Sequence, residues 1–172
     1  MGRDKAWLQV GGQPLIGRQL MLVRGLGAQE VFISGRAGVD YGDSKGRVLR
    51  DSFPNAGPLA GIERALATAT TPLLLVLAVD LPRMTAAVIH ELLAAASVHC
   101  GVIPRLNGHI EPLVAIYPVT AHAAVVTQLA AGQHAAQEFA AHCVTAKLAR
   151  FVDLPPDAAD AFLNWNTPAD WH

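Results

Sequence analysis

A single aspartate, Asp80, directly follows an apolar run over residues 73–79. Open α/β sheets bind ligands at the carboxyl ends of their strands, so we expect Asp80 at the mouth of a crevice. An ionised carboxylate is costly there unless it is paired, and a hard divalent cation that also holds phosphate oxygens is a natural partner. The alternative is that Asp80 caps the next helix, although Thr85 is better placed to do so. The segment therefore favours a metal-binding aspartate and leaves a capping role open.

A second segment, Gly57-Pro58-Leu59-Ala60-Gly61, opens a predicted helix. Amide groups at the start of a helix, with the helix dipole behind them, favour anions or polar ligand edges. The alternative is an ordinary loop with Pro58 in the first helical turn. Asp51 precedes this loop and could face the same crevice, although many such aspartates only form turns.

Three further polar residues have both a chemical and a structural interpretation. Lys5 can neutralise a phosphate as a point charge, but a solvated surface lysine is the commoner case. Asn164 and Asn166 are two residues apart, so an extended chain points both to one side and Trp165 to the other, toward the core. The two amides could then contact a polar ligand, or they could satisfy the backbone of a turn.

Other kinds of site leave no pattern in the sequence. The seven histidines show no metal-binding spacing, and there is no nucleophile elbow, complete Walker loop or dinucleotide fingerprint. The two cysteines, Cys100 and Cys143, form no Cys-x-x-Cys pair, so we expect two partly buried thiols.

Helix-like and strand-like segments alternate along the chain, which predicts an α/β fold with three layers, α/β/α, around a mostly parallel mixed sheet. Residues 73–79 are apolar throughout, as in a central strand buried on both faces. Asn107-Gly108 predicts a hairpin, and residues 37–46 a surface loop. The expected strands are 30–34, 47–50, 73–79, 101–105, 110–117 and 146–152, and the expected helices run from Pro14 to about Gly25 and over 59–69, 86–96, 119–131 and 133–141.

Composition limits the range of functions. The 172 residues fit one domain, and a net charge of −1 provides no general attraction to nucleic acid or to anionic lipid. The longest apolar run is too short to span a bilayer, and the charged first residues are not followed by a signal-peptide core. We therefore expect a cytoplasmic protein that binds neither nucleic acid nor membrane.

Six segments, taken together and in order, resemble the molybdenum cofactor guanylyltransferase family over essentially the whole chain, so residues 1–172 are interpreted as a single nucleotidyltransferase domain. They are Met1-Gly2-Arg3-Asp4-Lys5, Asp51-Ser52, Gly57-Pro58-Leu59-Ala60-Gly61, Val79-Asp80-Leu81-Pro82, Glu111-Pro112-Leu113 and Asn164-Trp165-Asn166-Thr167-Pro168.

The resemblance implies a Rossmann-like nucleotidyltransferase that binds GTP and Mg²⁺. Such an enzyme transfers GMP to the terminal phosphate of molybdopterin and yields molybdopterin guanine dinucleotide and pyrophosphate. It also implies transient contact with other molybdenum cofactor biosynthesis proteins or with apo-molybdoenzymes. The attacking phosphate is already an anion, so the barrier falls through positioning and charge neutralisation and no strong general base is needed.

The resemblance also implies roles for individual residues. Lys5 matches the phosphate-binding lysine, and Asp80 the magnesium aspartate. The remaining matches are Asp51, Gly57, Pro58 and Leu59 in the nucleotide pocket, Asn164 and Asn166 on the pterin-phosphate side, and Arg3 as an auxiliary phosphate contact.

The first segment matches only the tail of a longer family motif that begins Leu-Ala-Gly-Gly. We therefore expect residues 1–172 to lack the first strand and most of the glycine-rich loop, through a misplaced start or a shortened chain. A sheet without a central strand leaves backbone groups unpaired, so these residues should be inactive and poorly stable alone. Adding the residues encoded upstream in the same frame should restore guanylyl transfer.

Alternative functions remain open from the sequence. The position before Pro112 is often His in the family and is Glu111 here, which leaves a cytidylyltransferase, or another nucleotidyltransferase that uses CTP, as an alternative. A non-catalytic protein that binds and delivers the pterin cofactor is an alternative of another class, although such a carrier would not need a magnesium carboxylate. A third is a truncated fragment with no function of its own.

Overall fold

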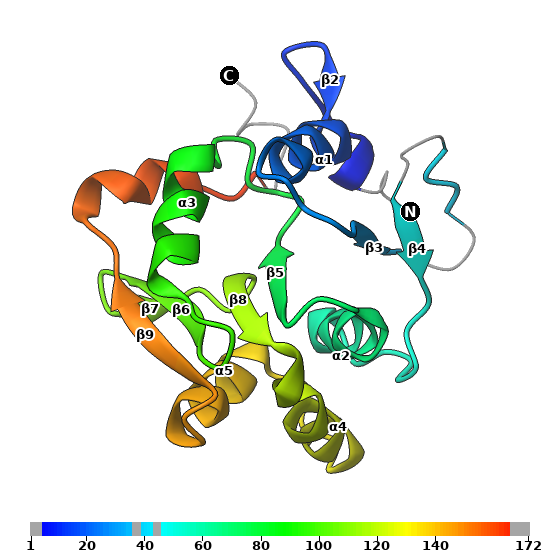
Figure 1. The fold of residues 1–172 in the computed structure, drawn as a ribbon. Coiled ribbons are helices and arrows are strands. Elements are labelled where there is room, and N and C mark those ends of the chain that lie inside the picture. Colours follow the sequence, from blue (N-terminus) through cyan, green and yellow to red (C-terminus); the bar gives the residue numbers. More distant parts are fainter. Residues whose placement is uncertain (1–4, 36–38, 43–45, 166–172) are drawn as a thin grey trace.

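The computed structural model describes residues 5–35, 39–42 and 46–165 (Figure 1). The helices are α1 (Leu15–Gly25), α2 (Pro58–Thr68), α3 (Ala86–Ala95), α4 (His122–Ala130), α5 (Ala136–Thr145) and the 3₁₀ helices η1 (Lys5–Trp7), η2 (Val119–Ala121) and η3 (Pro156–Phe162). The strands are β1 (Gln9–Val10), β2 (Gln13–Pro14), β3 (Phe32–Ser34), β4 (Arg47–Leu49), β5 (Leu73–Leu77), β6 (Gly101–Leu106), β7 (His109–Ile110), β8 (Val114–Pro118) and β9 (Ala149–Asp153).

The strands of the described residues form a small hairpin, β1–β2, and two sheets. One sheet is the parallel pair β3–β4, and the other has the order β5-β8-β6-β7, with β9 also paired to β6. Within the larger sheet only β6–β9 is parallel, while β5–β8, β6–β8 and β6–β7 are antiparallel. The α/β fold and the mixed sheet are confirmed, but the sheet's parallel character is only partial.

Helices cover both faces of the larger sheet (Figure 1). Along β6 and β8 the side chains alternate between two cores, so that Ile103 and Ala115 pack with residues of α2, α4 and α5. Their neighbours Val102 and Ile116 pack with residues of α3 and η3 on the opposite face. This alternation is the period of two expected of a strand that is buried on both faces. The three predicted layers are therefore present.

The local predictions that rested on turn and cap chemistry are confirmed. Asn107 and Gly108 both have positive φ, 51° and 83°, and they join β6 to β7 as a two-residue hairpin turn. Thr85 is the N-cap of α3, where its Oγ1 accepts from the amide of Val88 at 3.5 Å. The cap of α3 is thus Thr85 and not Asp80.

The prediction that β5 is buried on both faces is wrong, and one residue of the predicted surface loop is buried. All five residues of β5 are only partly buried, because one edge of this strand lines a cavity and pairs with no other strand among the described residues. Tyr41, within the predicted surface loop, is 6 % exposed and stacks on Trp7 with ring centroids 6.3 Å apart. It joins a small core with Ile16 and Leu20 of α1. The free energy gained by burying its aromatic ring outweighs the preference of the neighbouring polar residues for solvent.

None of the helices in the described part of the chain is long and apolar enough to cross a membrane.

Candidate active site

Asp80 lies in the turn that follows β5, which ends at Leu77 and not at Val79 as predicted. Its carboxylate oxygen Oδ2 is 3.5 Å from the amine Nζ of Lys5, which η1 positions from 75 residues earlier in the chain. The two side chains are 22 % and 44 % exposed, so the pair can be reached by a ligand. A partly exposed pair of this kind is weak, worth about 0–1 kcal/mol, and opens at little cost.

The backbone of the Asp80 turn is held by partners from two directions. Gln19 of α1 is buried, and its Nε2 donates to the carbonyl of Leu81 at 2.7 Å. From far along the chain, after η3, the backbone amide of Trp165 donates to the carbonyl of Asp80 at 3.0 Å. These bonds fix the turn, so the carboxylate is presented from a rigid support.

The segment Glu111-Pro112-Leu113 lies against the same strand end. The carbonyl of Leu113 accepts from the amide of Ala78 at 2.8 Å, and the buried hydroxyl of Tyr117 donates to the carbonyl of Pro112 at 2.9 Å. Burial raises the pKa of Glu111, and His109 opposes this shift. The segment therefore brings a second, half-buried carboxyl group to the turn that supports the end of β5.

Helix α2 begins with a glycine in the left-handed conformation, and no side chain caps its first amide groups. Gly57 is its N-cap with φ 63°, a conformation that L side chains rarely adopt, and no side chain caps the helix. Pro58 occupies the first turn and has no amide hydrogen to satisfy. A Cβ at Gly61 would collide with Oγ of Ser34, so glycine is required where α2 crosses the end of β3.

Asp51 lies beside this helix start. A Cβ built at Gly61 would be 4.0 Å from its Oδ1. Its pKa is raised, first by desolvation and then by the negative charge of Glu63, which lies on α2. Asp51 is nevertheless exposed at the surface, so a ligand can reach it from solvent.

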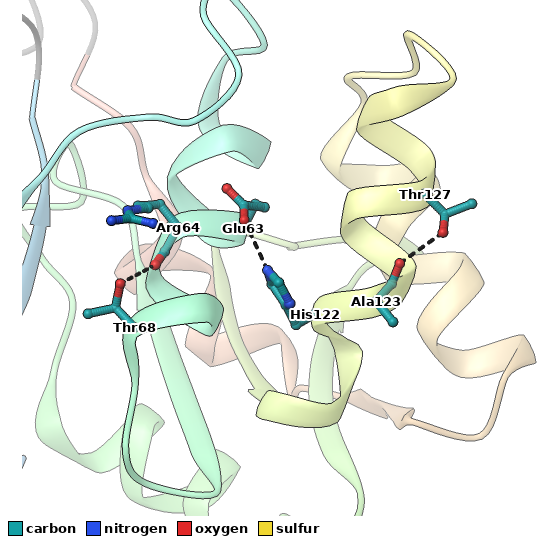
Figure 2. Close-up of polar contacts among 6 residues, drawn as sticks. All are labelled: Glu63, Arg64, Thr68, His122, Ala123 and Thr127. Carbon is teal, nitrogen blue, oxygen red and sulfur yellow. Dashed lines mark hydrogen bonds and ion pairs between the residues drawn. The ribbon is translucent and has the colours of Figure 1, made fainter.

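Glu63 joins α2 to α4 (Figure 2). It is 5 % exposed, and its Oε1 lies 2.9 Å from Nε2 of His122 at the start of α4. Its other oxygen, Oε2, is buried and has no hydrogen-bond partner among the described residues. Figure 2 also shows two bonds that stay within one helix, from Thr68 to the carbonyl of Arg64 and from Thr127 to the carbonyl of Ala123. The Glu63–His122 contact is the polar link that fixes α2 against α4.

A cavity of about 760 Å³ brings some of the predicted residues together. Lys5, Asp80 and Pro58 line it, whereas Gly57, Leu59, Asp51 and Asn164 do not. Asn164 is exposed and stands next to Trp165, whose amide bonds the Asp80 turn. Arg3 and Asn166 lie outside the described residues.

Three residues that the sequence did not single out also line this cavity: Gln19, Ser34 and Tyr41. A signal exists for two of them. Gln19 is polar within the apolar face of its predicted helix, and Tyr41 is an aromatic residue inside a Gly- and Asp-rich stretch. Ser34 precedes Gly35 at a strand end and carries no such signal.

The side chains at the site suit a metal ion that is coordinated mainly by phosphate oxygens and water. The described residues contain no group of three or more His, Cys, Asp or Glu side chains that could hold a metal ion by themselves. Asp80 provides one hard oxygen ligand beside Lys5, and Glu30, which also lines the cavity, has its carboxylate bonded to Thr70. Magnesium bound to phosphates commonly uses one or two carboxylates and fills its remaining positions with phosphate oxygens and water. The site therefore fits a metal–nucleotide complex better than a resident metal ion.

Comparison with known proteins places these features in one family. Residues 1–148 match the model of the MobA-like NTP transferase domain. The chain is 38% identical over 173 residues to a probable molybdenum cofactor guanylyltransferase of Opitutus terrae, a match that covers 99% of this chain and 86% of that protein. It is 32% identical over 180 residues to the molybdenum cofactor guanylyltransferase of Xanthomonas euvesicatoria, covering 99% and 85% of the two chains.

Solved structures show the same fold at lower identity. Molybdopterin-guanine dinucleotide biosynthesis protein A of Archaeoglobus fulgidus superposes with a TM-score of 0.76 at 21% identity, covering 99% of this chain and 88% of that one. The 2-C-methyl-D-erythritol 4-phosphate cytidylyltransferase of Thermus thermophilus superposes with a TM-score of 0.74 at 20% identity, covering 97% and 90%.

Because His122 contacts the buried Glu63 carboxylate, replacing His122 should destabilise the protein more than replacing Thr127 of the same helix. His122→Ala leaves the buried carboxylate without a partner and should lower the free energy of unfolding by about 2 kcal/mol, less than for a fully buried pair because the imidazole is partly exposed. Thr127→Ala on the same helix removes only an exposed intrahelical bond and should change it by less than about 0.5 kcal/mol. Urea unfolding measures both variants, and equal effects would contradict the assignment.

The raised pKa of Glu111 predicts a pH effect of definite sign. The folded protein holds this proton more tightly than the unfolded chain, so Glu111 lowers the free energy of unfolding as the pH rises above the usual carboxyl range, about 4. Glu111→Gln should therefore become progressively more stable than the parent protein as the pH rises. Glu91→Gln, on an exposed site of α3, serves as the control. Urea unfolding between pH 4 and pH 7, roughly the range of carboxyl titration, tests this, and a pH-independent difference would refute it.

Proposed function

Since the chain belongs to the family of MobA-like NTP transferases, we propose that it is a molybdenum cofactor guanylyltransferase. It transfers GMP from GTP to the terminal phosphate of molybdopterin, giving molybdopterin guanine dinucleotide and pyrophosphate. The observation that carries this proposal is the placement of the Lys5 amine 3.5 Å from the Asp80 carboxylate, at the end of β5. That is where an α/β sheet binds its ligand.

Lys5 and Asp80 have complementary roles in this proposal. Nucleotidyltransferases generally act with a divalent metal, and we assign Mg²⁺ to Asp80. The bound ion supplies Lewis-acid stabilisation of the charge that builds up on the phosphate oxygens. The Lys5 amine neutralises the same phosphates as a point charge. Because the Lys5–Asp80 pair is partly exposed and weak, the nucleotide can separate the two groups and take both as partners.

The start of α2 forms the nucleotide side of the site. The helix dipole and the backbone at Gly57, Pro58 and Leu59 favour a phosphate or the polar edge of a base. Asp51 stands beside this helix start and has a raised pKa. Its carboxylate therefore binds a proton more tightly than that of a solvated aspartate, and a hydrogen bond from an N–H group of the ligand would stabilise it.

The pterin phosphate lies on the other side of Asp80. Asn164 is exposed next to Trp165, and the backbone bond from Trp165 holds this segment against the Asp80 turn. We assign Asn164 and Asn166 to the pterin-phosphate side. The acceptor phosphate attacks as an anion, so these amides orient it and no side chain has to remove a proton.

The expected setting of the reaction follows from its substrates. GTP and molybdopterin are the partners, and we place the protein in the cytoplasm. The product would pass to an apo-molybdoenzyme or to another molybdenum cofactor protein through transient contact.

Asp80→Asn separates a catalyst from a cofactor carrier. We expect kcat to fall about 100-fold or more, because the amide keeps the shape of the side chain but loses its charge for the metal. Affinity for molybdopterin should change little. The assay uses the full-length protein with GTP, molybdopterin and Mg²⁺. Asp157→Asn, on an exposed site of η3, is the matched control. A parent protein that binds molybdopterin but forms no dinucleotide would favour the carrier, and turnover that Asp80→Asn leaves unchanged would contradict the role given to Asp80.

Base choice is tested by competition. With GTP and CTP supplied in equal amounts, the full-length protein should form the guanine dinucleotide preferentially. Chromatography of the products measures the ratio. An excess of the cytosine dinucleotide would identify a cytidylyltransferase while leaving the roles of Lys5 and Asp80 in place.

A further inference from the structure

Helix α1 binds the Asp80 turn through two consecutive side chains. In Figure 1 the segment that leads from β5 to α3 passes beside this helix. Gln19 donates to the carbonyl of Leu81 at 2.7 Å, and Nη2 of Arg18 donates to the carbonyl of the next residue, Pro82, at 3.0 Å. The Gln19 bond is buried, whereas the Arg18 bond is only partly buried. Solvent and ligands can therefore reach the guanidinium of Arg18.

The guanidinium of Arg18 keeps donors available for a ligand. Its bond to Pro82 is the one polar contact that this side chain makes among the described residues. A guanidinium is always charged and carries several N–H groups in one plane, so the groups not bonded to Pro82 remain free to donate. A cation that one backbone bond holds in place is preorganised to bind an anion.

A second cavity, of about 340 Å³, lies beside this guanidinium. It is lined by Arg18, Gln19, Met21, Leu22, Pro82 and Met84. Four of these six residues are apolar, and two are methionines, whose thioethers are soft and polarisable. No acidic side chain of the described residues lines it. The cavity therefore combines a single cation with soft, apolar walls.

The second cavity adjoins the candidate active site. Gln19 lines both cavities, and Pro82 follows Asp80 by two residues. The amide of Trp165 bonds the carbonyl of Asp80, which brings Asn164 to the same turn. A ligand whose phosphate lies between Asp80 and Asn164 can therefore extend across the turn into the second cavity.

We propose that the second cavity binds the dithiolene of molybdopterin and that Arg18 pairs with its negative charge. The inference rests on the proposed function and places a part of the acceptor that the function does not. The two sulfur atoms of the dithiolene, which also hold the molybdenum, are a few bonds from the phosphate of molybdopterin. They are soft and negatively charged, so methionine side chains around a guanidinium suit them.

Binding of molybdopterin to the full-length protein tests this assignment. Arg18→Gln should weaken binding about 10-fold or more, because it removes a charge-assisted hydrogen bond. The affinity for 6-hydroxymethylpterin phosphate, which has a pterin and a phosphate but no sulfur, should change by less than about 2-fold. Anaerobic titration calorimetry measures both Kd values. Equal effects on the two ligands would overturn the proposal, because Arg18 would then not recognise the sulfur atoms.

Further variants separate ligand binding from support of the Asp80 turn. Arg18→Lys keeps the positive charge and should recover most of the lost affinity. Met21 is 57 % exposed, so Met21→Glu places a carboxylate at the cavity without touching the turn and should weaken molybdopterin binding by repulsion. Arg150→Gln is the matched control, because Arg150 also donates to a backbone carbonyl, that of Ala95, and lines neither cavity. It should leave the Kd unchanged.

Turnover distinguishes a failure of this inference from a failure of the proposed function. In Arg18→Gln the KM for molybdopterin should rise, while kcat and the KM for GTP stay within about 2-fold. A lower kcat with an unchanged KM for molybdopterin would overturn this inference alone, because Arg18 would then only support the turn. A parent protein that binds molybdopterin but forms no dinucleotide would refute the proposed transfer, and the comparison of Kd values would still decide the role of Arg18.

Discussion

The account depends on one electrostatic arrangement, a carboxylate and an amine held opposite each other at the end of a strand. The Asp80 turn is fixed by the Gln19 side chain, which donates to the carbonyl of Leu81, and by the amide of Trp165, which donates to the carbonyl of Asp80. By contrast, the contact between Asp80 and Lys5 is long and partly exposed. A rigid support with a weak pair is the combination that a phosphate site needs. The carboxylate stays in place for a metal, and the amine is released to the nucleotide at little cost.

Helix α2 connects this site to the stability of the domain. Its first turn needs the positive φ of Gly57 and the missing side chain of Gly61 to approach β3 closely. Its second turn carries Glu63, a buried carboxylate joined to His122 of α4. A buried carboxylate with one unpaired oxygen is destabilising by itself, so its contact with His122 ties the position of the helix start to α4.

Local chemistry explains which features could be predicted from the sequence. Asn107-Gly108 and Thr85 were found because a hairpin turn and a helix cap each depend on a few neighbouring residues. The half-exposure of β5 could not be seen in its composition, because burial depends on which strand pairs with each edge. Glu63 and Ser34 were missed for the same reason, since their contacts are with residues distant in the chain, whereas Gln19 and Tyr41 carried a local signal that was not used. Of the candidate site residues, Lys5, Asp80 and Pro58 share one cavity, while the roles of all of them remain predictions.

The most direct test of the central claim is anomalous diffraction from crystals of the full-length protein grown with GTP and Mn²⁺. The account predicts a manganese peak in direct contact with the Asp80 carboxylate and the nucleotide phosphates, with the Lys5 amine turned toward the same phosphates. Ordered GTP with its manganese bound away from Asp80 would contradict it.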